Sequence, residues 1–238
     1  MDTPSNAIRF LNAYNRLDKG LRDIYNLKPG LSFTDVIRRT ATSNSIIKKF
    51  EDDLVDYGRL RNSIIHRSTE EPIAEPHDNI VERIEAIVRL ITSPPTVMQS
   101  IVNRNVFIAD GNVTLRQLLP AMYRNGYSNV PVYIDNTIVG VVNRKMIIDN
   151  LGKTIAENND INKLLDMKIV DSLDVFDKSA HYEVVSELAT IDSILYMFSQ
   201  DRKLTTIIVT KNGTYSEKPE GIIVTADILD MQAIIDNY

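Results

Sequence analysis

One short polar stretch of the chain has the composition of an acid–base site. It contains Arg61, Asn62 and His66, and the four-residue spacing of Asn62 and His66 places them on one face of a helix. A histidine, whose ordinary pKa is about 6.5, can transfer protons at neutral pH. Arg61 can bridge two phosphate oxygens as charge develops on them, while Asn62 can orient His66 or bind the phosphate. This chemistry suits metal-independent cleavage of RNA, in which the 2′-oxygen attacks the next phosphate.

The same residues also fit a purely structural role. Arg61 and Arg67 can pair with acidic side chains earlier in the same stretch, namely Glu51, Asp52, Asp53 and Asp56. His66 can cap the C-terminus of its own helix, where a cation is favourable. The residue types alone leave both roles open.

The composition is that of an ordinary globular chain. Its 238 residues are 43% hydrophobic and 25% charged, which excludes wholesale disorder and allows one large domain or two small ones. The absence of cysteine excludes disulfides, thiolate metal sites and thiol nucleophiles. No apolar run approaches the ~20 residues needed to cross a bilayer, and the first residues do not resemble a signal peptide. We expect a soluble, cytoplasmic protein with no membrane partner.

The distribution of charge and the absence of common motifs exclude several classes of function. The first 92 residues are neutral, and the rest of the chain carries the whole net charge of −5. A protein that wraps a duplex normally has a basic surplus, so we expect no DNA partner, whereas a small site for one RNA phosphate is compatible with this charge. The chain has no P-loop, dinucleotide-binding or nucleophile-elbow motif, and no metal-ligand spacing of histidines or carboxylates.

Residues 1–92 carry the apolar spacing of helices. The pattern predicts four of them, at 7–25, 33–40, 43–66 and 78–92. Such helices would bury their apolar stripes in an antiparallel four-helix bundle. Pro94 and Pro95 end the last helix, and residues 93–98 are predicted to be a linker.

Residues 99–238 contain an internal repeat of a helix, two strands and a helix. The first copy is predicted as helix 115–123, strands 129–134 and 137–142 around an Asp135-Asn136 turn, and helix 144–150; the second as helix 191–199, strands 204–210 and 221–225, and helix 226–236. Pro131 is aligned with Ile207, and Gly140 with Gly221. The copies, about 99–152 and 168–238, are each too small for a large core, so we expect them to pack together.

This repeat resembles the cystathionine-β-synthase (CBS) domain. The resemblance rests on the segments 126–133 and 138–143 in the first copy and on 204–209 and 221–227 in the second. It implies a CBS pair, or Bateman module, which binds an adenine nucleotide (AMP, ATP or a cyclic dinucleotide) as a regulatory ligand and performs no catalysis by itself.

The CBS resemblance also implies binding residues. The family's Gly-x-x-Thr-x-x-Asp turn places a hydroxyl near phosphate and a carboxylate on the ribose hydroxyls. In the second copy the carboxylate position is Asp227, but the hydroxyl position is Val224, with Thr225 displaced by one residue. In the first copy these positions are Asn143 and Met146, so the resemblance predicts one intact ribose site and one degraded site. Alternatively, Asp227 simply caps its helix.

Further nucleotide-binding positions lie beside the first turn and strand. Arg144 and Lys145 are candidates for a phosphate, although surface charge would also explain them. Ser128 and Pro131, before and within the first strand of the pair, complete the predicted site.

The arrangement of Arg61, Asn62 and His66 late in a bundle helix resembles the HEPN family, whose members cleave RNA without metal through an arginine and a histidine with four to six residues between them. The resemblance covers roughly residues 5–92 and implies a homodimer, because two such motifs meet at the subunit interface. Catalysis would then need no cofactor.

These observations predict an α+β protein in which an N-terminal four-helix bundle precedes a tandem CBS pair. The corresponding hypothesis is an endoribonuclease that acts on RNA under control of an adenine nucleotide, which a role in defence would suit. The alternative is a non-catalytic nucleotide sensor whose bundle dimerises or binds a partner, and in a third hypothesis the CBS pair is purely structural.

Overall fold

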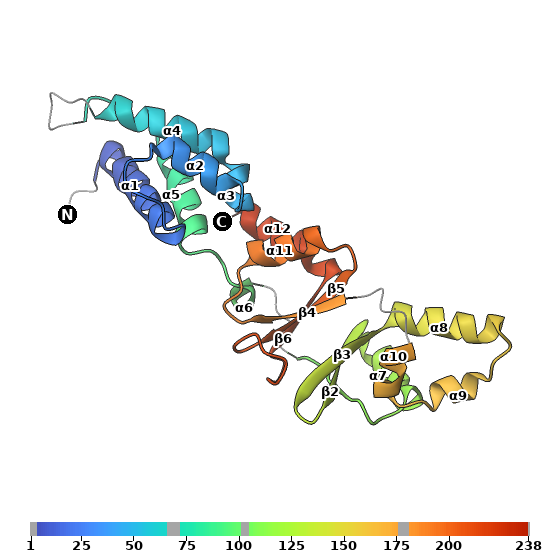
Figure 1. The fold of residues 1–238 in the computed structure, drawn as a ribbon. Helices are drawn as coiled ribbons and strands as arrows, with labels where there is room; N and C mark the ends of the chain where they lie inside the picture. Colours follow the sequence, from blue (N-terminus) through green and yellow to red (C-terminus); the bar gives the residue numbers. More distant parts are fainter. Residues whose placement is uncertain (1–3, 66–71, 101–104, 176–180, 238) are drawn as a thin grey trace. The chain divides into compact units, whose positions relative to one another are not determined.

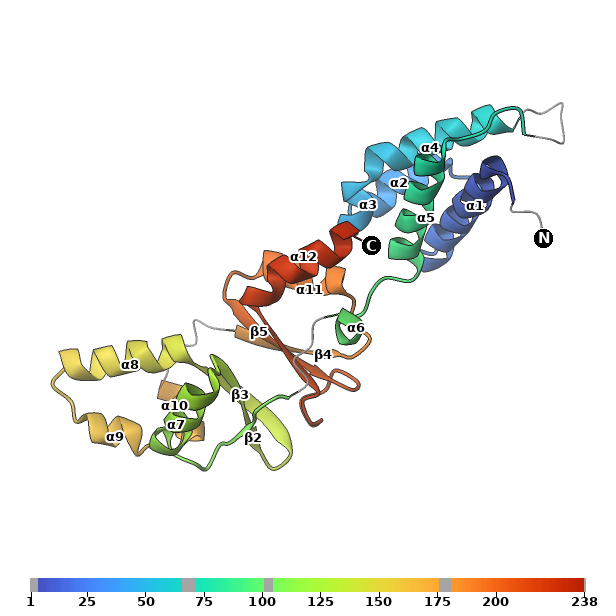
Figure 2. The same ribbon diagram turned by 180° about the vertical axis from the view of Figure 1, so that it is seen from behind.

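The structure is a computed structural model, and it describes residues 4–65, 72–100, 105–175 and 181–237. It divides into two compact units (Figures 1 and 2). One comprises Met1–Pro95 with Ile235–Tyr238, and the other comprises Thr96–Ile234. Each unit is described by itself.

The first unit is helical. Its elements are α1 (Asn6–Ile24), α2 (Phe33–Ala41), α3 (Ser45–Lys49), α4 (Glu51–Ile64) and α5 (Asp78–Thr92). Serine side chains accept hydrogen bonds from the first turns of α1 and α2, which sets where these two helices begin. The apolar stripes meet in one core that includes Phe10, Leu17, Ile37, Leu54 and Ile84.

The prediction of one continuous helix from residue 43 to 66 is wrong. The chain leaves helical geometry at Phe50, whose φ and ψ are −105° and 16°, and α3 and α4 are separate helices. Asn44 caps α3 by accepting a hydrogen bond from the Ile47 amide. The acidic residues Glu51, Asp52 and Asp53 stabilise the new N-terminus of α4, because negative charge is favourable there. The four-helix bundle is therefore not confirmed: five helices share this unit among the described residues.

The second unit mixes helices and strands, which fits an α+β fold. Its first half contains α6 (Val97–Ser100), β1 (Ala109–Asp110), α7 (Leu115–Asn125), β2 (Asn129–Ile134), β3 (Thr137–Asn143), α8 (Arg144–Ala156), α9 (Ile161–Leu165) and α10 (Ile169–Val175). Its second half contains β4 (His181–Ser186), α11 (Ile191–Gln200), β5 (Leu204–Thr210), β6 (Gly221–Val224), a 3₁₀ turn (Thr225–Asp227) and α12 (Ile228–Asn237). In both views α11 and α12 lie together beside the second sheet (Figures 1 and 2).

The two sheets have the same topology. Each has three strands, in the orders β1-β2-β3 and β4-β5-β6, and in each the first pair is parallel and the second antiparallel. Gly140 pairs with Val132 and Gly221 pairs with Val209, so Pro131 is equivalent to Ile208. The alignment of Pro131 with Ile207 is thus wrong by one residue, a slip that would turn every side chain of the strand to the opposite face.

Several elements of the repeat were not predicted. β1 has only two residues, and β4 has the sequence His-Tyr-Glu-Val-Val-Ser, in which no regular alternation marks a strand. The predicted start of the second copy at residue 168 also differs from the structure. Ile169, the first residue of α10, is fully buried in the core of the first half, together with Leu164 of α9.

The two halves of this unit pack against each other through their sheets. Ile138, Val141 and Ile208 form a buried apolar cluster that joins them. Thr206 donates a side-chain hydrogen bond of 3.2 Å to Asn129, and these two residues occupy equivalent positions in the two repeats. The Ile138 amide donates to the Tyr215 carbonyl at 2.8 Å. The halves therefore form one body, with an approximate twofold relation near Asn129 and Thr206.

Candidate functional site

A pocket of about 400 Å³ lies where the two repeats meet. It falls within the size range of small-molecule sites. Its lining residues come from both halves: Ser128, Asn129, Asn143, Arg144, Lys145, Met146, Asp149, Asn150, Arg202, Lys203, Thr205 and Thr225.

The first wall of the pocket is the N-terminus of α8. Asn143 is buried and caps this helix, because its side chain accepts a 2.8 Å hydrogen bond from the Met146 amide. The Arg144 amide donates to the Ser128 carbonyl at 3.0 Å, and Arg144 Nε donates to the Tyr127 carbonyl at 3.0 Å. These bonds fix the turn between β3 and α8 against the chain that enters β2.

The second wall is the short segment that leads into β5. Asp201 accepts a 2.8 Å hydrogen bond from the Lys203 amide and lies 2.7 Å from His181 Nδ1. The His181 amide donates to the Lys203 carbonyl at 2.7 Å. The bond to His181, followed by the bond from the Lys203 amide, lowers the pKa of Asp201. The segment carrying Arg202 and Lys203 is therefore held in place by the start of β4.

The chemistry of the lining suits a polar, anionic ligand. Four basic side chains line the pocket (Arg144, Lys145, Arg202 and Lys203), against one acidic residue, Asp149, which pairs with Lys145. Hydroxyl and amide side chains provide further donors and acceptors. The positive end of α8, a helix of 13 residues, lies beside them and favours negative charge.

Four of the seven predicted nucleotide-binding residues line this pocket, namely Ser128, Arg144, Lys145 and Thr225. The other three do not. Pro131 is buried in β2 and pairs with Val141. Val224 is the last residue of β6, and Asp227 ends the 3₁₀ turn that follows.

Asp227 contacts its own main chain. Its carboxylate accepts a 2.8 Å hydrogen bond from the Val224 amide, so it caps the turn between β6 and α12. The sequence allowed two roles for Asp227, ribose binding and capping, and this hydrogen bond is the capping role. The turn that was predicted to be degraded contributes both Asn143 and Met146 to the pocket lining, whereas the turn that was predicted to be intact contributes Thr225 but not Val224 or Asp227.

Several lining residues of the pocket were not predicted from the sequence, among them both basic residues of the second wall. Arg202 and Lys203 directly precede β5, in the place where Gly126 precedes β2 in the first copy. A basic pair at the start of a repeated strand was the signal that could have identified them. Asn129 and Thr205, the first residue of β2 and the second of β5, were missed because polar residues near the start of a strand are common in any sheet.

Of the three predicted catalytic residues, the structure describes two. Arg61 Nη1 donates to the Asn62 side-chain oxygen at 3.3 Å, and the Arg61 guanidinium lies 6.0 Å from the ring centroid of Tyr14. Arg61 Nε is buried and has no hydrogen-bond partner among the described residues. His66 and Arg67 lie outside the described residues, so their relation to Arg61 is not defined.

Three of the four acidic residues expected to pair with Arg61 or Arg67 have other partners. Asp56 pairs with Arg59 at 2.7 Å, Asp53 with Arg83 at 2.6 Å and Glu51 with Lys48 at 2.7 Å. Within the described ranges, no carboxylate forms an ion pair with Arg61. Burial, followed by the charge of Asp18, raises the pKa of the neighbouring Tyr14 to about 12.

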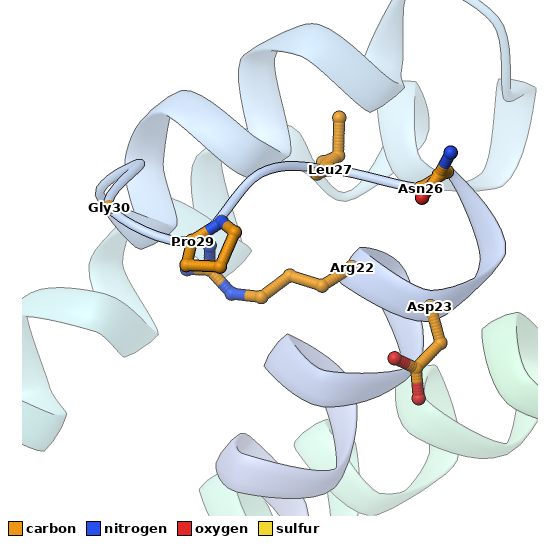
Figure 3. Close-up of a pocket in the computed structure, with 6 residues that line it drawn as sticks. All are labelled: Arg22, Asp23, Asn26, Leu27, Pro29 and Gly30. Atoms are coloured by element: carbon orange, nitrogen blue, oxygen red, sulfur yellow. The ribbon is translucent and has the colours of Figure 1, made fainter.

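The helical unit has a separate pocket of about 570 Å³ where α1 ends (Figure 3). Figure 3 shows the Arg22 side chain extending toward Pro29, whereas Asp23 points away. Arg22 forms a 2.9 Å ion pair with Asp18 and donates to the Leu31 carbonyl at 3.0 Å. Arg22 therefore holds the loop after α1, and this structural role explains why an arginine lines the pocket.

Among the described residues, no cluster of three or more histidine or acidic side chains is arranged to hold a metal ion. In the same part of the chain, no helix combines the length and the apolar character that a bilayer crossing requires.

Comparison with known proteins identifies one domain. Residues 98–153 match the family model of the CBS domain, so the chain contains a CBS domain that includes β1, α7, β2, β3 and most of α8. No finding indicates a HEPN domain. A search of the curated proteins finds no match to this chain.

Solved structures similar to this chain contain CBS domains. A CBS domain-containing protein of unknown function from Bacillus anthracis is 20% identical, with 58% of this chain and 93% of that chain covered and a TM-score of 0.45. Protein MJ1225 from Methanocaldococcus jannaschii is 16% identical, with 69% and 55% covered and a TM-score of 0.46. CBSX2 in complex with AMP is 18% identical, with 60% and 98% covered and a TM-score of 0.44.

Proposed function

We propose that residues 96–234 are a non-catalytic, nucleotide-sensing regulatory module and that the helical unit serves for dimerisation or for binding a partner protein. The observation that carries the proposal is the pocket between the repeats, with its basic side chains and the capped N-terminus of α8. Helix N-termini and basic groups together form favourable sites for phosphate. The CBS domain at residues 98–153 supports an adenine nucleotide as the ligand.

The pocket also supplies a means of regulation. Because it is lined by both repeats, a nucleotide bound there interacts with both and favours the arrangement of the repeats that it fits best. A ligand shifts a conformational equilibrium only through such differential affinity. The module then transmits the presence of the nucleotide to whatever the helical unit binds.

Binding is tested by thermal unfolding of the full chain with AMP, ADP, ATP and cyclic di-AMP. A ligand at 100 times its Kd stabilises a protein by about 2.7 kcal/mol, which is a clear upward shift of the unfolding temperature. We expect Arg144→Ala to reduce this shift. The control is Arg124→Ala, which removes an exposed arginine whose Nε also donates to a main-chain carbonyl, that of Pro120, and which does not line the pocket. If none of the four nucleotides stabilises the wild type, the sensor proposal is wrong.

The role of the helical unit is tested by the mass of the full chain in solution. Large apolar side chains are exposed on this unit, among them Ile8, Ile24, Ile65 and Ile73. Light scattering should give twice the chain mass of 27.0 kDa for a homodimer. A monomer would leave partner binding as the role of this unit.

RNA cleavage is a second candidate function, and one observation favours it. Arg61 and Asn62, two residues of the predicted motif, are joined by a 3.3 Å hydrogen bond, and no carboxylate in the described parts of the chain forms an ion pair with Arg61. The test is incubation of a labelled RNA with the wild type and with His66→Ala in EDTA, with and without a nucleotide. Cleavage by the wild type alone, leaving 2′,3′-cyclic phosphate ends, would establish this function. An RNA that stays intact under all conditions would exclude it.

A further inference from the structure

The charged residues that line the pocket indicate which kind of ligand it can bind. Its four basic residues come in two adjacent pairs, Arg144–Lys145 on the first repeat and Arg202–Lys203 on the second. The single acidic residue of the lining, Asp149, forms a 2.5 Å ion pair with Lys145. Three positive charges therefore remain in excess, and both walls contribute to them.

The two basic walls are held in place independently. On the first, the Arg144 amide and Nε are bound to the carbonyls of Ser128 and Tyr127. On the second, Asp201 and His181 hold the main chain of Lys203. Main chain that is fixed before a ligand arrives, as at Arg144 and Lys203, need not be ordered when the ligand binds.

Asn129 stands between the walls. Its side chain accepts the hydrogen bond from Thr206, its equivalent in the other repeat. This bond ties the start of β2 to the start of β5, and the two basic pairs, one from each repeat, line the same pocket.

An excess of positive charge on both sides favours a ligand with more than one phosphate group. Asp149 already neutralises one charge of the first pair, so one phosphate bound there would leave the charges of Arg202 and Lys203 without a counter-charge among the lining residues, and like charges in a partly enclosed site repel each other. We propose that the pocket selects a ligand with at least two phosphate groups, one at Arg144–Lys145 and another at Arg202–Lys203. This inference rests on the proposed nucleotide-sensing function and adds the class of nucleotide. A nucleoside triphosphate and a cyclic dinucleotide share this chemistry.

The test is isothermal titration of the full chain with AMP, ATP, cyclic di-AMP and inorganic triphosphate. We expect ATP or cyclic di-AMP to bind at least about tenfold more tightly than AMP, because each added charge-assisted hydrogen bond contributes roughly that factor. Whichever of the two binds more tightly identifies the source of the phosphates, and tight binding of triphosphate alone would show that no base is required.

The variant that isolates the second wall is Arg202→Ala with Lys203→Ala. It should weaken the binding of ATP or cyclic di-AMP about tenfold or more and should change AMP binding by less than about threefold. The matched control is Lys211→Ala with Lys218→Ala, which removes the same charge from exposed positions of the same repeat outside the pocket. It should leave all affinities unchanged.

The outcomes separate this inference from the proposed function. If AMP binds as tightly as ATP and cyclic di-AMP, or if the control variant weakens binding as much as the pocket variant, the two-phosphate inference is overturned and the sensor remains. If no nucleotide binds the wild type, the sensor itself is wrong.

Discussion

The two repeats end their last strand in turns that look alike but differ in charge and in role. In the first, Asn143 caps α8 and is followed by Arg144 and Lys145, and the turn lines the pocket. In the second, Val224 is followed by Thr225, Ala226 and Asp227, and the acid caps the turn itself. A helix N-terminus flanked by bases attracts an anion, whereas one already occupied by a carboxylate has its positive end satisfied. Duplication of the fold in this chain has therefore not duplicated the ligand-binding turn.

The largest expected effect is on the contact that joins the repeats. Ile208 is fully buried there, so Ile208→Ala should destabilise the second unit by about 2–5 kcal/mol through lost burial and a cavity. It should also abolish nucleotide binding, because the pocket needs both halves. The measurement is urea unfolding followed by far-UV circular dichroism.

Ile222 provides the control for Ile208. It is paired with Ile208 across the β5–β6 ladder but is only half-buried. Ile222→Ala should cost clearly less stability and should preserve binding. An equal loss of unfolding free energy in both variants would show that the contact between the repeats contributes no additional stability.

A smaller effect is expected at the two caps. Asn143→Ala and Asp227→Ala should each lower the free energy of unfolding by about 0.5–2 kcal/mol, since Asn143 accepts a hydrogen bond from the first turn of α8 and Asp227 accepts one from the Val224 amide that precedes its own turn. Titration with ATP should separate them: Asn143→Ala weakens binding and Asp227→Ala does not. A tenfold loss of ATP affinity in Asp227→Ala would instead indicate that Asp227 binds the ribose.

The smallest effect concerns the hairpin loops, which also differ between the repeats. The first hairpin turns through Asp135 and Asn136, both with positive φ, whereas the second has a longer loop that Glu217 holds by accepting hydrogen bonds from the Asn212 and Thr214 amides. The bonds from the Asn212 amide and side chain lower the pKa of Glu217 to about 2. Its stabilising effect is therefore complete above its ordinary pKa of 4.5 and is lost as the pH falls toward 2.

Thermal unfolding between pH 7 and pH 2 checks this pH dependence. Glu217→Gln should have a lower unfolding temperature than the wild type at pH 7, and the difference should disappear near pH 2. Glu220→Gln, which removes the same charge from the same loop, should behave like the wild type throughout. A difference that persists at pH 2 would mean that Glu217 acts through packing rather than through its charge.

Local signals in the sequence predicted much of the fold. Ser32 before an apolar stripe marked the start of α2, and the Asp135-Asn136 turn between two β-rich runs marked the β2–β3 hairpin. The break at Phe50 was missed because the apolar spacing continues through it, and only the main-chain angles show the change of direction. β4 was missed because its six residues have no regular apolar alternation.

The candidate site was predicted only in part, for a related reason. Ser128, Arg144, Lys145 and Thr225 were identified from their place in a motif, and they line the pocket. Arg202 and Lys203 lie outside any motif, and although they form a basic pair at the start of β5, the sequence does not indicate that they line one pocket with residues of the other repeat.

The sequence by itself determined the elements of this protein, the duplication in its second half and the presence of a CBS repeat, because helix caps, turns and apolar periodicity act over a few residues. Only the tertiary structure decided the register of the repeats, the division of residues 43–66 into two helices and the side on which the pocket forms. These depend on side chains that meet across long stretches of chain, such as Asn129 with Thr206 and His181 with Asp201. Whether a carboxylate such as Asp227 binds a ligand or its own main chain is decided by the groups that packing brings within hydrogen-bond distance, and spacing in the sequence does not contain that information.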